Sequence, residues 1–186
     1  MTAQVPAAGG FVPLFDGESL AGWEYVRDTV GWSAEDGILV CSGEGRGWLR
    51  TARMYADFVL RLEYAISAGG NSGIFLRSLL EGRPAYNGME MQILDDHGAP
   101  PTVSSSGAIY DAVAPTVNAA RPSEQWNEVE VTCIGSRIAI VLNGEHIVDA
   151  DNSTAESLRG RPQVGYIGLQ NYHCPVRFRN VLIQEL

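Results

Sequence analysis

The chain has 186 residues, of which 45% are hydrophobic and 19% charged, and it contains 21 glycines and 9 prolines. This composition is typical of a globular, turn-rich protein and excludes a disordered or fibrous one. The net charge is -9 and every basic residue is an arginine, so a nucleic-acid partner is not expected.

The first residues lack the basic start and the apolar run of a secretory signal. No stretch approaches the roughly 20 apolar residues of a membrane helix, so no membrane partner is expected. We expect residues 1–10 to be flexible and residues 11–186 to form a single domain. A cytoplasmic location is expected unless a leader has been lost, and the sequence indicates no oligomeric state.

Short runs of alternating or continuous apolar residues recur along the chain between Gly, Asn, Asp and Pro, which is typical of β-strands. In chain order they cover residues 37–43, 57–67, 72–80, 88–94, 127–135, 137–144, 145–150, 164–170 and 176–186. Asn143-Gly144 predicts a tight hairpin, because both turn positions favour positive φ. Residues 155–160 are expected to form one short helical turn.

Many short strands with little helix predict an all-β fold, a two-sheet antiparallel jelly-roll sandwich. Residues 96–125 differ from the strand-rich segments, since they are rich in Pro, Ser and Ala and are too long for a simple turn. Long ordered loops of this kind often carry function.

Side chains along a strand alternate between the two faces of a sheet. In three neighbouring runs this rule places Glu63, Arg77, Glu90 and Gln92 on the face opposite the core, with Phe75 beside them. If the three strands share one sheet, these residues converge on a surface that suits a sugar. The alternative is a solvated face with cross-strand ion pairs.

Further candidates for chemistry follow the ends of strands. Asp95 and Asp96 come after the run that carries Glu90, and a bulge would decide which of them faces the groove. His97 has a possible catalytic or metal role, and His173 a possible role in the groove. Glu90 and Asp95 also allow a retaining glycosidase, although their offset fits that pair of acids poorly.

Eight segments follow one another over nearly the whole chain: FVPLFDGESLAGWE, GWSAEDGILVCSG, DFVLRLEYAISAGGNSGIFLR, GMEMQILDD, GAIYDAVAP, EQWNEVEV, LNGEHIVD and VGYIGLQNYHCPVRFRNVLI. Each is weak evidence alone, whereas their order is specific. In this order they resemble the 3-keto-disaccharide hydrolase domain family. The resemblance implies a concanavalin A-like jelly roll, which agrees with the strand pattern.

Members of this family are similar to enzymes that act on glycosides already oxidised at C3 and release the group at C1. The resemblance therefore implies a small carbohydrate substrate, a 3-keto-glycoside, cleaved by a lyase or a net hydrolase. A C3 ketone acidifies the C2 proton, so a base can form an enolate that expels the C1 substituent. Such a reaction needs a base, a partner for the enolate oxygen and an acid for the leaving group.

The resemblance suggests residues for each of these roles and for the surrounding groove. The catalytic candidates are Glu90 or Asp95 as base or metal ligand, Arg77 and Gln92 as enolate or hydroxyl partners, and Tyr110 or His97 as proton donor. The candidate substrate-binding residues are Glu63, Asn71, Phe75, Asp111, Gln170 and His173.

One motif departs from the family pattern. The family often has a histidine two residues after the glutamine of GLQ, whereas here Gln170 is followed by Asn171, Tyr172 and only then His173. Either His173 takes that role through a shifted loop, or another group carries the proton.

A divalent cation is also implied by the resemblance, since it could polarise the C3 carbonyl. Oxygen ligands from Glu90, Asp95 or Asp96 would suit calcium or magnesium. A non-catalytic, lectin-like carbohydrate-binding module is the main alternative to an enzyme, because a fold does not fix a function.

Overall fold

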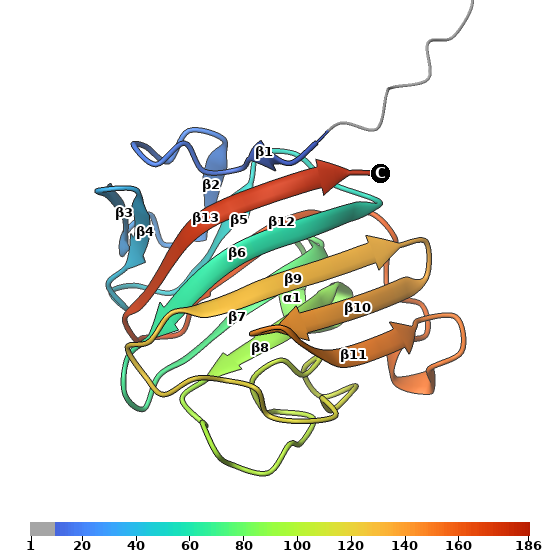
Figure 1. The fold of residues 1–186 in the computed structure, drawn as a ribbon. Coiled ribbons are helices and arrows are strands. Elements are labelled where there is room, and N and C mark those ends of the chain that lie inside the picture. Colours follow the sequence, from blue (N-terminus) through green and yellow to red (C-terminus); the bar gives the residue numbers. More distant parts are fainter. Residues whose placement is uncertain (1–9) are drawn as a thin grey trace, which may run out of the picture.

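The computed structural model describes residues 10–186, and nearly all of the N-terminal segment expected to be flexible lies outside this part. Two antiparallel sheets pack face to face as the layers of a sandwich (Figure 1). The predicted all-β jelly-roll sandwich is confirmed. Within residues 10–186, no helix has the length and apolar character needed to cross a membrane.

The larger sheet has the strand order β11-β10-β9-β6-β13-β4-β3, and β1 pairs with β13 beside this path. Its strands are β1 (Val12–Pro13), β3 (Trp32–Glu35), β4 (Ile38–Cys41), β6 (Phe58–Ile66), β9 (Asn127–Ile134), β10 (Arg137–Leu142), β11 (Glu145–Asp151) and β13 (Val176–Glu185).

The smaller sheet has the order β2-β5-β12-β7-β8. Its strands are β2 (Trp23–Arg27), β5 (Gly47–Thr51), β12 (Tyr166–Asn171), β7 (Asn71–Ser78) and β8 (Met89–Leu94). A short helix, α1 (Pro84–Asn87), joins β7 to β8, and the predicted helical turn near residue 155 is the 3-10 helix η1 (Glu156–Leu158).

Every predicted strand segment overlaps a strand of the structure. Asn143 and Gly144 join β10 to β11 with φ values of 52° and 85°, as the hairpin signal predicts. The strands β1, β2, β3 and β5 lie outside the predicted segments. Of these, β2 and β5 form one side of the smaller sheet.

The hydrophobic core lies between the two sheets and is built by alternate residues of each strand. In β8, the side chains of Met89, Met91 and Ile93 are fully buried in this core. Burying each of them contributes about 1.5–3 kcal/mol to folding. The same alternation turns Glu90 and Gln92 to the opposite, outer face of the smaller sheet.

The alternation fails at Arg77, because β7 contains a β-bulge. Ser78 pairs with Tyr166 and Phe75 pairs with Gly168, so β7 has one residue more than β12 over this stretch. Arg77 adopts a positive φ of 51° and its side chain is fully buried. The bulge therefore turns Arg77 away from the face that carries Phe75.

The Arg77 guanidinium holds loop segments together instead of entering a groove. It donates to the carbonyl oxygens of Ala56 at 2.8 Å and Gly135 at 2.7 Å. It also forms an ion pair with Asp57 at 3.0 Å. The sequence-based placement of Arg77 among the groove residues is wrong.

We predict that Arg77→Ala lowers the free energy of unfolding by about 3 kcal/mol, because three buried or partly buried acceptors lose their donor. As a control, Arg137→Ala breaks the exposed pair with Asp149 and should cost less than about 1 kcal/mol. Urea unfolding of both variants measures the difference. Equal losses of unfolding free energy in the two variants would show that Arg77 does not hold these loop segments together.

Candidate active site

The outer face of the smaller sheet carries a pocket of about 600 Å³. Its floor comes from β5, β12, β7 and β8, and its walls include residues 82–85, Tyr110 and residues 171–173. A second apolar cluster, separate from the core, lies on this face and contains Trp48, Phe75 and Ala85. The pocket thus combines an aromatic surface with the polar residues described below.

Two glycines in the central strands make room for large side chains on the floor. A Cβ atom at Gly168 would lie 2.0 Å from the Trp48 indole, so this ring lies close against the β12 backbone. Trp48 meets Phe75 edge to face, with ring centroids 5.2 Å apart. A Cβ atom at Gly73 would lie 2.1 Å from a Glu90 carboxyl oxygen. A larger residue at either position would displace the side chain above it.

Glu90 is the one acid that lines the pocket among residues 10–186. Only 3% of the surface of Glu90 is exposed to solvent, and Glu90 forms no ion pair in the described part of the chain. Burial raises the pKa of Glu90 from 4.5 to about 8, while a hydrogen bond with Gln170 and the charge of Arg83 oppose this shift. The carboxyl can therefore exchange a proton close to neutral pH.

Amide side chains lie beside Glu90 in the pocket lining. Gln92 is 3% exposed and donates to the Asn71 side-chain oxygen at 3.4 Å. The Cys174 thiol donates to the Asn71 carbonyl at 2.8 Å and so fixes the backbone at Asn71. The Gln170 side-chain oxygen is buried without a hydrogen-bond partner in the part of the chain that the structure describes. Such groups offer donors and acceptors to sugar hydroxyls.

The long loop between β8 and β9 brings Tyr110 beside Glu90. The backbone N–H of Gln92 donates to the Ala108 carbonyl oxygen at 3.0 Å. The backbone N–H of Tyr110 donates to the Glu90 carbonyl oxygen at 2.8 Å. These bonds cover the outer edge of β8, which would otherwise be unpaired. The Tyr110 side chain joins the pocket lining as a result.

The structure also brings Asn71, Phe75, Gln170 and His173 into the pocket lining, as the sequence predicts. His173 is exposed, has a positive φ of 60°, and donates its backbone N–H to the Asn171 side chain at 3.2 Å. The shifted histidine therefore reaches the pocket rim. The roles assigned to these residues stay predictions.

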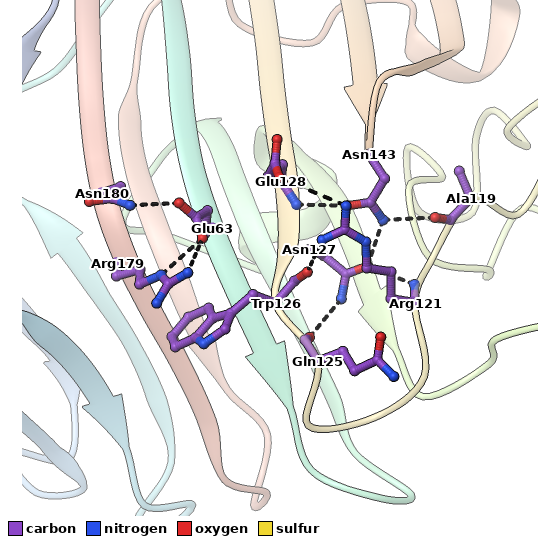
Figure 2. A network of polar contacts seen from close by, with 10 residues as sticks. All are labelled: Glu63, Ala119, Arg121, Gln125, Trp126, Asn127, Glu128, Asn143, Arg179 and Asn180. Atoms are coloured by element: carbon purple, nitrogen blue, oxygen red, sulfur yellow. Dashed lines mark hydrogen bonds and ion pairs between the residues drawn. The ribbon is translucent and has the colours of Figure 1, made fainter.

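Glu63 does not join this group, because β6 and β8 belong to different sheets. Glu63 lies on the larger sheet beside Arg179 and Asn180 (Figure 2). Each of these two side chains donates a hydrogen bond of 2.6 Å to the Glu63 carboxylate. The prediction that Glu63 and Glu90 share one face is wrong. Alternation along β6 was correct, but it does not say which sheet the strand enters.

Asp95 and Asp96 also lie outside the pocket lining. Asp95 accepts the Gly69 backbone N–H at 2.8 Å, and Asp96 accepts that of Ser106 at 3.0 Å. Both carboxylates therefore hold loop backbone, and the expected placement of Asp95 in the groove is wrong.

The proposed cation ligands therefore do not meet at one site. In residues 10–186, no group of three or more His, Cys, Asp or Glu side chains could hold a metal ion. Glu90, Asp95 and Asp96 do not fit a shared calcium or magnesium ion, and dependence on a divalent cation stays a prediction.

His97 and Asp111 are exposed residues of the long loop between β8 and β9, and they do not line the pocket. The His97 ring nitrogen Nδ1 lies 2.6 Å from the Ala120 carbonyl oxygen. Asp111 accepts the Tyr86 hydroxyl at 3.0 Å. Their expected places in the groove are wrong, because their side chains bind the loop and α1 instead.

Several lining residues are not indicated by the sequence reasoning. They are Val26, Arg27, Arg46, Trp48, Arg83 and Tyr172. The segments WEYVR and GWLRT, which form β2 and β5, mix apolar and polar residues without a strict period of two, so they give only a weak strand signal. No pattern marks Arg83, which directly precedes α1.

Glu90→Gln should change how stability depends on pH. The folded protein keeps the Glu90 proton up to about pH 8, whereas the unfolded chain releases it near pH 4.5. Wild-type stability therefore falls as the pH rises between these values, because deprotonation favours the unfolded chain. The neutral glutamine removes this dependence, so the variant should exceed wild type by a few kcal/mol above about pH 8.

Urea unfolding across this pH range measures the difference. Glu145→Gln, at an exposed position in β11, should keep the wild-type dependence. Parallel stability curves for wild type and Glu90→Gln would contradict the raised pKa.

Known proteins resemble this chain over most of its length. A Bacteroides thetaiotaomicron protein named 3-keto-disaccharide hydrolase is 25% identical over 237 residues, which cover 98% of this chain and 81% of the relative. A crystal structure of a candidate glycosyl hydrolase from Parabacteroides distasonis matches with a TM-score of 0.83 and 26% identity, covering 96% of this chain and 100% of the other.

The carbohydrate-binding module CBM66 from Bacillus subtilis matches with a TM-score of 0.64 at 18% identity, covering 88% of this chain and 96% of the module. This likeness shows a shared fold alone. The model of the 3-keto-alpha-glucoside-1,2-lyase-like domain family matches residues 10–184. The resemblance found in the sequence is thus confirmed, and the chain belongs to this family.

Proposed function

We propose that the protein cleaves glycosides oxidised at C3 of the sugar, and that Glu90 removes the proton from C2. The observation that carries this proposal is the buried Glu90 carboxyl, whose pKa is raised to about 8 on the pocket floor. Membership of the family and the relative named 3-keto-disaccharide hydrolase support this substrate class.

The reaction follows from the acidity of the C2–H bond beside a ketone. Glu90 takes the proton, and the electron pair of the C2–H bond forms an enolate whose charge rests on the C3 oxygen. The C1–O bond then breaks, its electron pair leaves with the aglycone, and an alkene joins C1 to C2. Addition of water across that alkene makes the net reaction a hydrolysis.

Donors near Glu90 are suited to the enolate oxygen. Arg83 is the guanidinium whose charge acts on the Glu90 carboxyl, and it replaces Arg77 as the cationic candidate. Gln92 and Gln170 add side-chain N–H groups from the floor. Donors aimed at developing charge in a site of low water content are a major source of catalysis.

The leaving oxygen needs a proton from another group. Tyr110 and His173 both line the pocket and carry a titratable donor, whereas His97 does not reach it. We assign the proton to one of these two side chains.

The pocket favours elimination over the two alternatives. A retaining glycosidase needs a second acid about 5 Å from the first, and Glu90 is alone in the lining that residues 10–186 provide. A lectin-like module remains the second candidate, because Trp48, Phe75 and the amides suit sugar binding. A lectin, however, has no need of a buried carboxyl that lowers the stability of the fold as the pH rises from 4.5 to about 8.

Cleavage of matched substrates tests the proposal. The protein should release nitrophenol from a nitrophenyl 3-keto-glucoside and leave the unoxidised glucoside intact. Where water adds across the alkene, deuterium from the solvent should appear at C2 of the hydrated product. Glu90→Gln should lower kcat/KM by about 1,000-fold, in line with the loss of a general base, while the circular dichroism of the fold is kept. Inertness towards both substrates would favour the lectin.

Repeating the assay with a chelator tests the divalent cation. Loss of activity that calcium or magnesium restores would establish dependence on the ion, and unchanged activity would remove it from the reaction.

The pH dependence of kcat/KM should report the ionisation of Glu90 in the free protein. Because the base must be deprotonated, kcat/KM should rise with pH and level off above about pH 8. A profile already flat above about pH 5 would show that an acid with an ordinary pKa, and not Glu90, is the base. Glu145→Gln should leave the profile unchanged.

A further inference from the structure

The charge of the pocket is opposite to that of the protein. The chain has a net charge of -9, yet the pocket lining formed by residues 10–186 contains three arginines, Arg27, Arg46 and Arg83, and a single acid, Glu90. Because the pKa of Glu90 is raised to about 8, that acid is largely neutral at pH 7. The lining therefore presents positive charge to a ligand in an otherwise acidic protein.

Two of these arginines are free to bind a ligand. Most arginines of the described chain pair with a carboxylate, as Arg50 does with Glu24, but Arg27 and Arg46 form no ion pair within residues 10–186. The carboxylate of Asp28 lies close to them, but it accepts the backbone N–H of Arg46 at 2.9 Å. Both guanidinium side chains thus remain available in the lining.

The position of this pair separates it from the proposed base. Arg27 ends β2 and Arg46 directly precedes β5, whereas Glu90 lies on β8 at the other edge of the sheet. The path from β5 to β8 crosses β12 and β7, which amounts to three strand spacings or about 14 Å. A sugar ring over Glu90 does not reach Arg27 and Arg46, but a group attached to its C1 can extend towards them.

The floor between the two ends suits such an extended group. Trp48 on β5 pairs with Gln170 on β12, and both line the pocket between Glu90 and the two arginines. The indole offers an apolar surface to a flat or aliphatic portion of the leaving group. The planar guanidinium groups beyond it match an oxyanion, which they bind through paired N–H donors.

We infer that the natural substrate carries an oxyanion, such as a carboxylate, sulfate or phosphate, on its leaving group, and that Arg27 and Arg46 bind it. This inference rests on the proposed function, because it places the sugar ring over Glu90. It defines Arg27 and Arg46 as determinants of substrate choice, distinct from the groups that act on C2 and C3.

Binding of unoxidised aryl glucosides tests the inference independently of cleavage. The probes are 4-carboxyphenyl glucoside, 4-sulfophenyl glucoside and the neutral methyl ester of the former, with both anomers of each titrated by calorimetry. Wild type should bind at least one of the two anionic probes about tenfold more tightly than the ester, and high salt should reduce that preference. The probe that binds more tightly distinguishes carboxylate from sulfonate recognition.

Variants assign the preference to the two arginines. Arg27→Gln/Arg46→Gln should abolish the preference, whereas Arg159→Gln, at an exposed position outside the pocket, removes one arginine charge and should keep it. Equal affinity of wild type for all three probes, or a preference that survives in the double variant, would overturn the inference.

The 3-keto forms of the same probes separate this inference from the proposed function. Suppose that the 3-keto forms of the 4-carboxyphenyl glucoside and of its methyl ester are cleaved at equal kcat/KM. This result would overturn the inference that the leaving group is anionic, and it would leave the proposed elimination intact. Absence of cleavage with a retained charge preference in binding would count against the elimination, while anion recognition by the two arginines would stand.

Discussion

The burial of the Glu90 carboxyl is the constraint on which the pocket depends. Gly73 on β7 leaves the space that this carboxyl occupies. The loop residue Tyr110 hydrogen-bonds to the edge of β8, the strand that carries Glu90. Burial without an ion pair opposes ionisation, so the group is neutral where an exposed glutamate would be charged. The site therefore holds a carboxyl that binds and releases a proton close to neutral pH, and stability falls as the pH rises from 4.5 to about 8.

Charges are balanced differently inside and outside the pocket. On the larger sheet, carboxylates and arginines neutralise one another across strands, as Glu63 and Arg179 do in Figure 2 and as Glu130 and Arg61 do nearby. On the smaller sheet, Arg50 and Glu24 pair in the same way outside the pocket. Arg27 and Arg46 line the pocket without such partners within residues 10–186. The paired regions agree with a solvated sheet surface, and the pocket has the unbalanced charge expected of a binding site.

The sequence predicts what depends on local periodicity and cannot predict what depends on pairing between distant segments. Alternation along β8 correctly turned Glu90 and Gln92 away from the core. It could not show that β6 belongs to the other sheet, which separates Glu63 from them. It also failed at Arg77, because a bulge adds one residue to β7 and breaks the period of two.

The overlooked part of the site lies on short strands with weak signals. Because β2 and β5 contain five residues each and are bordered by Gly or charged residues, the pattern does not distinguish them from loops. The sequence pattern therefore does not place Trp48, Arg27 and Arg46 in the site. Asp95 was expected to be catalytic or a metal ligand, and Asp96 a metal ligand. Both carboxylates instead bind loop backbone that only the fold brings near.

The most direct test of this account is a titration of the Glu90 carboxyl carbon by nuclear magnetic resonance, with its signal assigned by its absence in Glu90→Gln. The account predicts a titration midpoint of about 8. A midpoint near 4.5, the value from which burial is expected to raise it, would contradict the buried, neutral carboxyl and with it the proposed proton abstraction.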